Sequence, residues 1–117
     1  ARQVIRLLGT AVLAGALSWH PTPARLGVQA EEFHLVLSRA SVKAGVVEIE
    51  LQNAGEDSHD LRVRKVGGHH TFTIRETKPG ARRTIAINMK PGRYRLWCSL
   101  ADHRALGMQT VLRVRRR

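Results

Sequence analysis

The feature that most constrains the fold of this chain is a series of short runs in which apolar and polar residues alternate. This period of two is typical of a β-strand that turns one face to a core. After Glu31 the pattern predicts seven strands, over residues 33–37, 46–51, 60–66, 71–76, 83–88, 93–98 and 109–114. The segments between them are rich in glycine, proline, asparagine and aspartate, the residues of turns. No helical period lasts longer than a turn or two, so the sequence predicts an antiparallel β-sandwich.

The N-terminal stretch has a different character. Two early arginines, an apolar run over residues 7–19 and small residues just before Glu31 are typical of an export signal. The apolar run is shorter than the roughly 20 residues that span a bilayer. We therefore expect residues 1–30 to be an export signal or, alternatively, an N-terminal anchor, and residues 31–117 to be the folded domain. The protein is then expected outside the cytoplasm, in the periplasm or at the outer face of the cell membrane.

The stretch "WCSLADHRALGM" contains the only cysteine of the chain, which excludes an internal disulfide. Cys98 ends one predicted strand, Met108 begins the next, and His103 lies midway in the loop between them. Neighbouring strands hold the two ends of such a loop together, so thiol, imidazole and thioether approach one point. His59, at the start of another predicted strand, is expected to face the same end of the sandwich.

Two histidines, one cysteine and one weak methionine are the ligand set of a blue-copper electron-transfer centre. Soft sulfur favours Cu(I), imidazole accommodates Cu(II), and a trigonal site with a long axial bond changes little when one electron arrives. Structural zinc sites seldom include methionine. The ligand set therefore predicts one copper ion that alternates between Cu(I) and Cu(II).

The motifs "NAGEDSHD" and "KPGRYRLWC", together with the Cys98-x4-His103-x4-Met108 spacing, make the chain after Glu31 resemble the cupredoxins of plastocyanin, auracyanin and azurin type. The resemblance implies a Greek-key β-sandwich of about seven to eight strands. It also implies that His59, Cys98 and His103 are equatorial copper ligands and that Met108 is the axial one. The implied function is that of a one-electron carrier.

The sequence also leads to expectations for several residues other than the four predicted ligands. Many cupredoxins have asparagine after the first histidine ligand, where it ties the two ligand loops; here the residue is Asp60. A carboxylate beside the copper is expected to lower the reduction potential unless it is paired or protonated. Tyr94 is expected to pin a corner between strands, and Trp97 to pack inside the sandwich. His69 and His70 are expected to face solvent, because adjacent strand residues point to opposite faces.

The composition is strongly basic, with 20 lysines and arginines against 9 acidic residues and a formal charge of +11. This charge predicts transient redox partners with acidic docking faces, and the terminal "RVRRR" offers an alternative contact with an anionic membrane surface. Aromatic residues make up only 4% of the chain, which argues against nucleic-acid binding by base stacking. We expect a monomer that is not an enzyme, since four ligands leave copper no open position. Extracytoplasmic copper storage or delivery is the alternative function.

Overall fold

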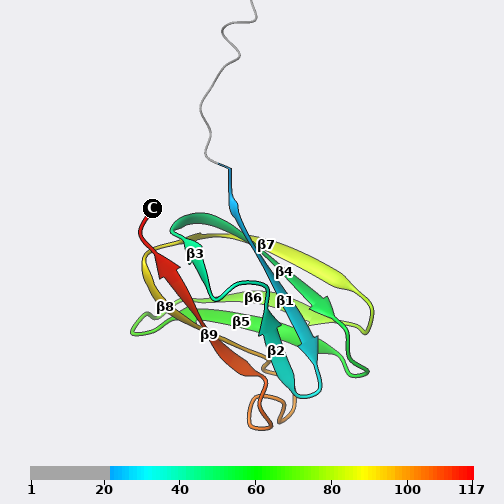
Figure 1. The fold of residues 1–117 in the computed structure, drawn as a ribbon. Helices are drawn as coiled ribbons and strands as arrows, with labels where there is room; N and C mark the ends of the chain where they lie inside the picture. The colour runs from blue at the N-terminus through cyan, green and yellow to red at the C-terminus, as the bar shows by residue number, and fades with distance from the viewer. Residues whose placement is uncertain (1–21) are drawn as a thin grey trace, which may run out of the picture.

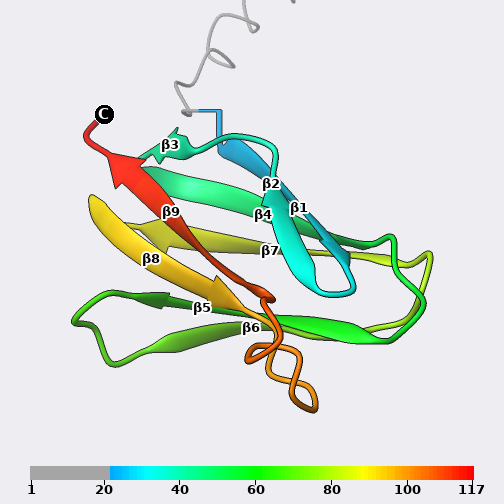
Figure 2. The same cartoon turned by 60° about the horizontal axis from the view of Figure 1, so that its bottom comes forward.

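The computed structural model describes residues 22–117, which form nine strands in two sheets packed face to face (Figure 1). One sheet has the order β2-β1-β4-β7 and consists of β1 (Ala24–Glu31), β2 (His34–Leu37), β4 (Gly45–Asn53) and β7 (Arg82–Met89). The other has the order β3-β9-β8-β5-β6 and consists of β3 (Ser41–Lys43), β5 (His59–Lys65), β6 (Thr71–Thr77), β8 (Gly92–Trp97) and β9 (Gln109–Arg115). Figure 2 shows β8 and β9 of the five-stranded sheet in front of β4 and β7 of the other sheet. This part of the chain contains no helix that is long and apolar enough to cross a membrane. The predicted all-β sandwich is confirmed.

All seven predicted strands form, with ends that differ by at most two residues from the prediction. The structure adds β1 and β3, which the sequence analysis did not identify. These two strands make the parallel pairings of the fold, β1 with β4 and β3 with β9, while the other pairings are antiparallel. The sheets are therefore mixed, and the prediction of a purely antiparallel sandwich is wrong in this respect.

Strand β1 also corrects the predicted start of the folded domain. Leu26, Val28 and Ala30 are almost fully buried, and the strand lies between β2 and β4 in the first sheet. The small residues before Glu31 that suggested a cleavage site are core positions of this strand. The boundary predicted between residues 30 and 31 is therefore not the boundary of the fold, which begins no later than Ala24. Residues 1–21 lie outside the described residues, and an export signal or anchor there stays a prediction.

The inward faces of the two sheets meet in one apolar core. Its largest fully buried aliphatic side chains include Ile49, Leu51, Leu61, Leu96 and Leu112. Burying a side chain of this size typically stabilises a protein by about 1.5–3 kcal/mol. A slip of one residue would turn a whole strand inside out, so this core fixes the register of the strands. It thereby fixes the positions at which β5 begins and β8 ends.

A tyrosine fixes the turn between β7 and β8. The Tyr94 hydroxyl accepts a hydrogen bond from the Lys90 N–H at 2.9 Å and donates one to the Lys90 carbonyl at 3.1 Å. The ring itself is buried in the core. The predicted corner is confirmed, and it holds the start of the strand that leads to Cys98.

Candidate metal centre

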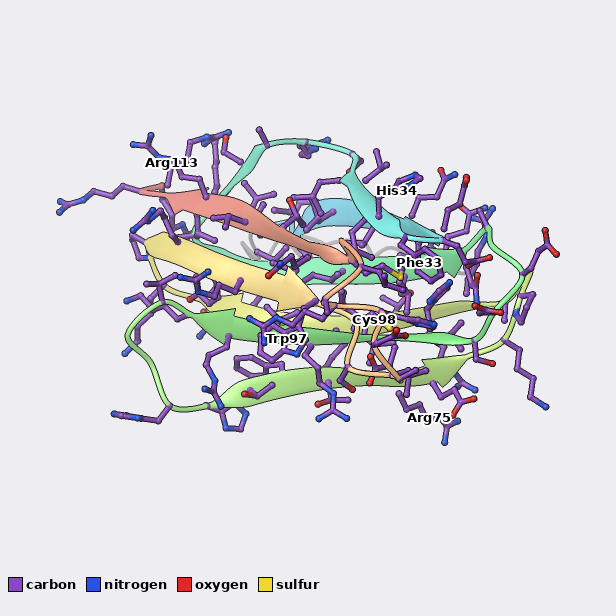
Figure 3. The ribbon with its side chains drawn as sticks, turned by 90° about the horizontal axis from the view of Figure 1, so that it is seen from below. Phe33, His34, Arg75, Trp97, Cys98 and Arg113 are labelled. Atoms are coloured by element: carbon purple, nitrogen blue, oxygen red, sulfur yellow. The ribbon has the colours of Figure 1, made fainter. Side chains whose placement is uncertain are left out.

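Three of the predicted ligands meet at one end of the sandwich. His59 is the first residue of β5, Cys98 directly follows β8, and His103 lies in the loop that joins β8 to β9. One donor atom from each lies within 4.8 Å of the other two. His59 and Cys98 are fully buried, and His103 is 7% exposed. Figure 3 looks onto this end, where Cys98 and Phe33 lie beside the ligand loop.

The pairing of the strands explains why these residues converge. Strands β5 and β8 are antiparallel neighbours, with Arg62 opposite Trp97, so the start of β5 lies beside the end of β8. Strands β8 and β9 pair up to Trp97 and Gln109, which closes the loop that carries His103. The sequence pattern thus predicted the convergence correctly.

The distances between the donor atoms fit a trigonal metal site. Cys98 Sγ lies 3.6 Å from His103 Nδ1 and 3.9 Å from His59 Nδ1. Metal–sulfur bonds of about 2.3 Å and metal–nitrogen bonds of about 2.0–2.1 Å at trigonal angles would hold sulfur and nitrogen about 3.8 Å apart. A thiolate with two imidazoles is also the equatorial donor set of type 1 copper sites. The residues therefore fit such a metal by both spacing and chemistry.

The ligand loop is a compact series of hydrogen-bonded turns. The His103 N–H donates to the Leu100 carbonyl at 3.1 Å, and the Cys98 N–H donates to the Met108 carbonyl at 3.1 Å. Gly107 has a φ of 128°, and a Cβ at this position would lie 2.7 Å from the Phe33 carbonyl oxygen. Glycine is needed here both for the backbone conformation and for the close contact. The contact packs the ligand loop against the turn between β1 and β2.

Met108 lies directly before β9 and is fully buried. Its backbone N–H donates to the His103 carbonyl at 3.0 Å, and its own carbonyl accepts from Cys98. The methionine is thus attached through its backbone to two of the three clustered residues. Its role as an axial ligand stays a prediction.

Asp60 ties the two ligand-bearing segments together. Its Oδ1 accepts a hydrogen bond from the Ser99 N–H at 2.6 Å, and its Oδ2 accepts one from the Ser99 hydroxyl at 2.5 Å. The Arg62 Nε donates to the same Oδ2 at 3.1 Å. The carboxylate is therefore both hydrogen-bonded and paired with a cation, which opposes the lowering of the reduction potential expected for an unpaired acid.

Glu32 is a site residue that the sequence analysis missed. Its Oε2 lies 2.5 Å from His59 Nε2, and its Oε1 accepts from the Glu56 N–H at 2.5 Å. This backbone hydrogen bond is the main cause that lowers the pKa of Glu32, and the contact with His59 acts in the same direction. Twenty-seven residues separate Glu32 from His59, so no spacing motif links them.

The burial of the cluster affects its protonation. Desolvation raises the pKa of the Cys98 thiol above its ordinary value, so the metal-free protein keeps this group protonated and a metal must displace the proton. His103 is the member nearest to solvent, with its ring 5.4 Å from the half-exposed Phe33 ring. The ring edge of His103 is therefore the part of the cluster that another molecule can approach.

The remaining histidines of the described domain lie outside the cluster. His69 and His70 are exposed in the loop between β5 and β6, as predicted, and His34 is exposed on β2. Trp97, however, does not pack inside the sandwich. Because Leu96 faces the core, Trp97 lies on the outer face, where the Arg104 guanidinium sits 4.6 Å from the ring centroid.

Solved structures share this arrangement of strands. The reduced auracyanin from the photosynthetic bacterium Roseiflexus castenholzii is 16% identical with a TM-score of 0.60, over 82% of this chain and 98% of that chain. The purple cupredoxin from Nitrosopumilus maritimus is 15% identical with a TM-score of 0.55, over 75% and 97% of the two chains. The fold is that of the cupredoxins. The His59–Cys98–His103 cluster fits a cupredoxin copper site.

The cupredoxin fold also occurs within a larger enzyme. The copper-containing nitrite reductase from Thermus scotoductus SA-01 is 23% identical with a TM-score of 0.54, over 94% of this chain but only 27% of that chain. No protein family model and no curated protein matches this chain in sequence. The likeness is thus one of fold, and the chemistry must be argued from the site itself.

Proposed function

We propose that this protein is a type 1 copper protein that carries single electrons between redox partners. The observation that carries the proposal is the buried cluster in which Cys98 Sγ faces the Nδ1 atoms of His59 and His103 at 3.9 and 3.6 Å. Copper held by two imidazoles, one thiolate and a weak axial thioether changes its oxidation state with little rearrangement. The same proposal places the carrier outside the cytoplasm, supported by the basic and apolar start of the sequence.

The residues around the cluster suit a carrier rather than an enzyme. His59, Cys98 and Met108 are fully buried, which keeps water away from these three side chains. His103 reaches the surface beside the Phe33 ring, which is 37% exposed, and its Nε2 lies 3.6 Å from an oxygen of the exposed Asp57 carboxylate. A partner that docks here approaches the His103 ring more closely than any other part of the cluster. We therefore expect electrons to enter and leave at this edge.

The arginines of the five-stranded sheet support a partner with an acidic surface. Three cross-strand pairs on its outer face place cations directly opposite each other: Arg93 with Arg113, Arg64 with Arg95, and Lys43 with Arg115. Like charges in such positions destabilise a sheet, and an anionic partner would relieve the repulsion. The other sheet, in contrast, pairs its outward arginines with glutamates. An acidic protein is the proposed partner, and an anionic membrane surface would satisfy the same charges.

The proposal is tested by titrating the purified protein with Cu(II) and recording its visible spectrum before and after ascorbate. We expect an intense thiolate-to-copper band that saturates at one copper per chain and bleaches reversibly. The Cys98→Ser variant should lose the band, while His70→Ala, which alters an exposed histidine outside the cluster, should keep it. Copper that binds without the band would contradict the proposal. Copper that a chelator removes at once, without reversible reduction, would instead indicate storage or delivery.

A further inference from the structure

Glu32 lies in the turn between β1 and β2, far along the chain from the clustered ligands, yet its carboxylate reaches His59. We infer that Glu32 is a positioning residue that fixes the tautomer and the ring orientation of His59, so that Nδ1 is the nitrogen available to a metal. The inference deepens the proposed function and rests on it, because His59 is one of the three donors.

The two nitrogens of the His59 ring face different partners. Nε2 lies 2.5 Å from the acceptor Oε2 of Glu32, whereas Nδ1 lies 3.9 Å from Cys98 Sγ. A carboxylate only accepts hydrogen bonds, so it holds the ring hydrogen on Nε2 and leaves the lone pair of Nδ1 directed at the cluster. The ring is fully buried, so water does not replace this partner. A carboxylate behind a metal-binding histidine also makes the ligand nitrogen more basic.

The carboxylate is held in place by the segment that leads into β5. Its Oε1 accepts the Glu56 N–H at 2.5 Å and the Asp57 N–H at 3.4 Å. A Cβ at position 55 would collide with the Glu32 carboxylate. The carboxylate therefore fits here only because residue 55 is glycine. The backbone from Gly55 to Asp57 thus forms a seat for the side chain. The seat explains how a carboxylate with 21% of its side-chain surface exposed keeps one orientation.

The two carboxylate oxygens of Glu32 have different partners. This difference distinguishes the positioning of His59 from a role in which Glu32 only holds the turn between β1 and β2 in place. Oε1 binds the backbone amides, and Oε2 alone binds His59. In Glu32→Gln, an amide whose oxygen keeps the backbone hydrogen bonds presents its NH2 group to His59. Nε2 then becomes the acceptor, the ring hydrogen moves to Nδ1, and the nitrogen that faces Cys98 loses its lone pair for a metal. The substitution leaves the shape almost unchanged, so a purely structural role predicts no such switch.

The experiment is nitrogen-15 NMR of the histidine rings in the copper-free full chain, in mildly alkaline buffer, followed by copper affinity in competition with a chelator. We expect the wild type to carry the His59 hydrogen on Nε2 and Glu32→Gln to carry it on Nδ1. Copper affinity should fall about 10–100-fold in the variant, the usual effect of removing such a partner. Glu31→Gln is the matched control, because it removes the same charge next to Glu32 from a side chain that accepts a hydrogen bond from Gln29 rather than from His59.

Two results would overturn the inference. One is a wild-type ring with its hydrogen on Nδ1, a measurement that does not depend on the folding of any variant. The other is a folded Glu32→Gln protein in which the His59 tautomer and the copper affinity are both unchanged. Glu32 would then serve only to hold the turn between β1 and β2 in place. If the wild type has the expected tautomer but does not give the visible copper band, the proposed function fails while the positioning of His59 stands.

Discussion

The Asp60 carboxylate accepts both the backbone N–H and the hydroxyl of Ser99, at 2.6 and 2.5 Å. The residue after the first histidine of the cluster is therefore bonded to the residue after the cysteine. Two segments that are 39 residues apart in sequence are joined beside the site by one side chain.

Replacing Asp60 by alanine should destabilise the copper-free protein. Hydrogen bonds to charged groups typically contribute about 1.5–3 kcal/mol each, and the substitution removes the only acceptor described for the Ser99 amide. We expect the free energy of unfolding, measured by urea denaturation, to fall by at least this amount. Asp60→Asn keeps an acceptor oxygen and should cost less. An alanine variant as stable as the wild type would show that the connection contributes nothing.

Met108→Leu tests the axial position. The exchange conserves volume, so the fold should lose less than about 1.5 kcal/mol. The thiolate band should remain, because Cys98 and both histidines are untouched. The reduction potential, measured by voltammetry, should rise, since a weak donor that favours Cu(II) has been removed. An unchanged potential would remove Met108 from the ligand set.

Gly107→Ala should disturb the ligand loop more than the same change at Gly80. Both glycines have a positive φ, 128° and 82°, but only the new Cβ at position 107 meets an atom, the Phe33 carbonyl oxygen at 2.7 Å. Gly80 has open space around it and measures the backbone cost alone, about 1 kcal/mol or more. We expect a larger loss of unfolding free energy at Gly107 and an altered visible spectrum. Equal losses of unfolding free energy at the two positions would mean that the ligand loop moves without cost to make room for the new Cβ.

The stability contributed by Glu32 should depend on pH. Its pKa in the folded protein lies below the ordinary value of 4.5, chiefly because the Glu56 N–H donates to the carboxylate. A group with a lowered folded pKa stabilises the fold above its unfolded pKa, and this contribution is lost as the pH falls through the folded value. Urea midpoints of the copper-free wild type and of Glu32→Gln should therefore differ most near neutral pH and converge in acid. A difference that stays constant across this range would contradict the assignment.

The pairs of cations on the outer face of the five-stranded sheet should lower the stability of the fold and raise the rate of electron exchange with an acidic partner. Arg93→Gln removes one side of the pair with Arg113, and we expect a stability gain of about 0.2–1 kcal/mol at low salt. Electron exchange with an acidic redox protein, followed by stopped flow, should slow in the same variant and lose part of its dependence on ionic strength. Arg82→Gln, on the other sheet and paired with Glu50, is the control. Identical rates in the two variants would assign the partner to another surface.

The predicted and the missed parts of the site differ in what holds them together. Cys98 and His103 lie five residues apart in the loop of one hairpin, so alternation and spacing sufficed to predict that they meet. Glu32 escaped prediction because its seat consists of backbone amides and a glycine, which no residue pattern marks. Trp97 was placed inside, but it lies between Leu96 and Cys98, which are both fully buried, so the alternation of the chain puts its ring on the outer face.

The missed strand β1 has a different cause. Its core residues Leu26 and Val28 occupy alternate positions, as a strand requires. They also follow an apolar run and precede small residues, so the same stretch fitted the pattern of an export signal. Only pairing with β4, some twenty residues further along the chain, distinguishes the two interpretations. A local pattern does not contain that information.

The pairing of the last strand sets the order in which a newly made chain can acquire its metal. Strand β9 joins β8 on one side and β3 on the other, so the five-stranded sheet is complete only after β9 has been made. The turn that presents His103 is closed by the same pairing, while His59 has been available since β5 was made. Until β9 has paired, the loop that carries His103 is open and the three donors are not all held together. We therefore expect the complete donor set to form only after the slow, long-range contacts of the sandwich.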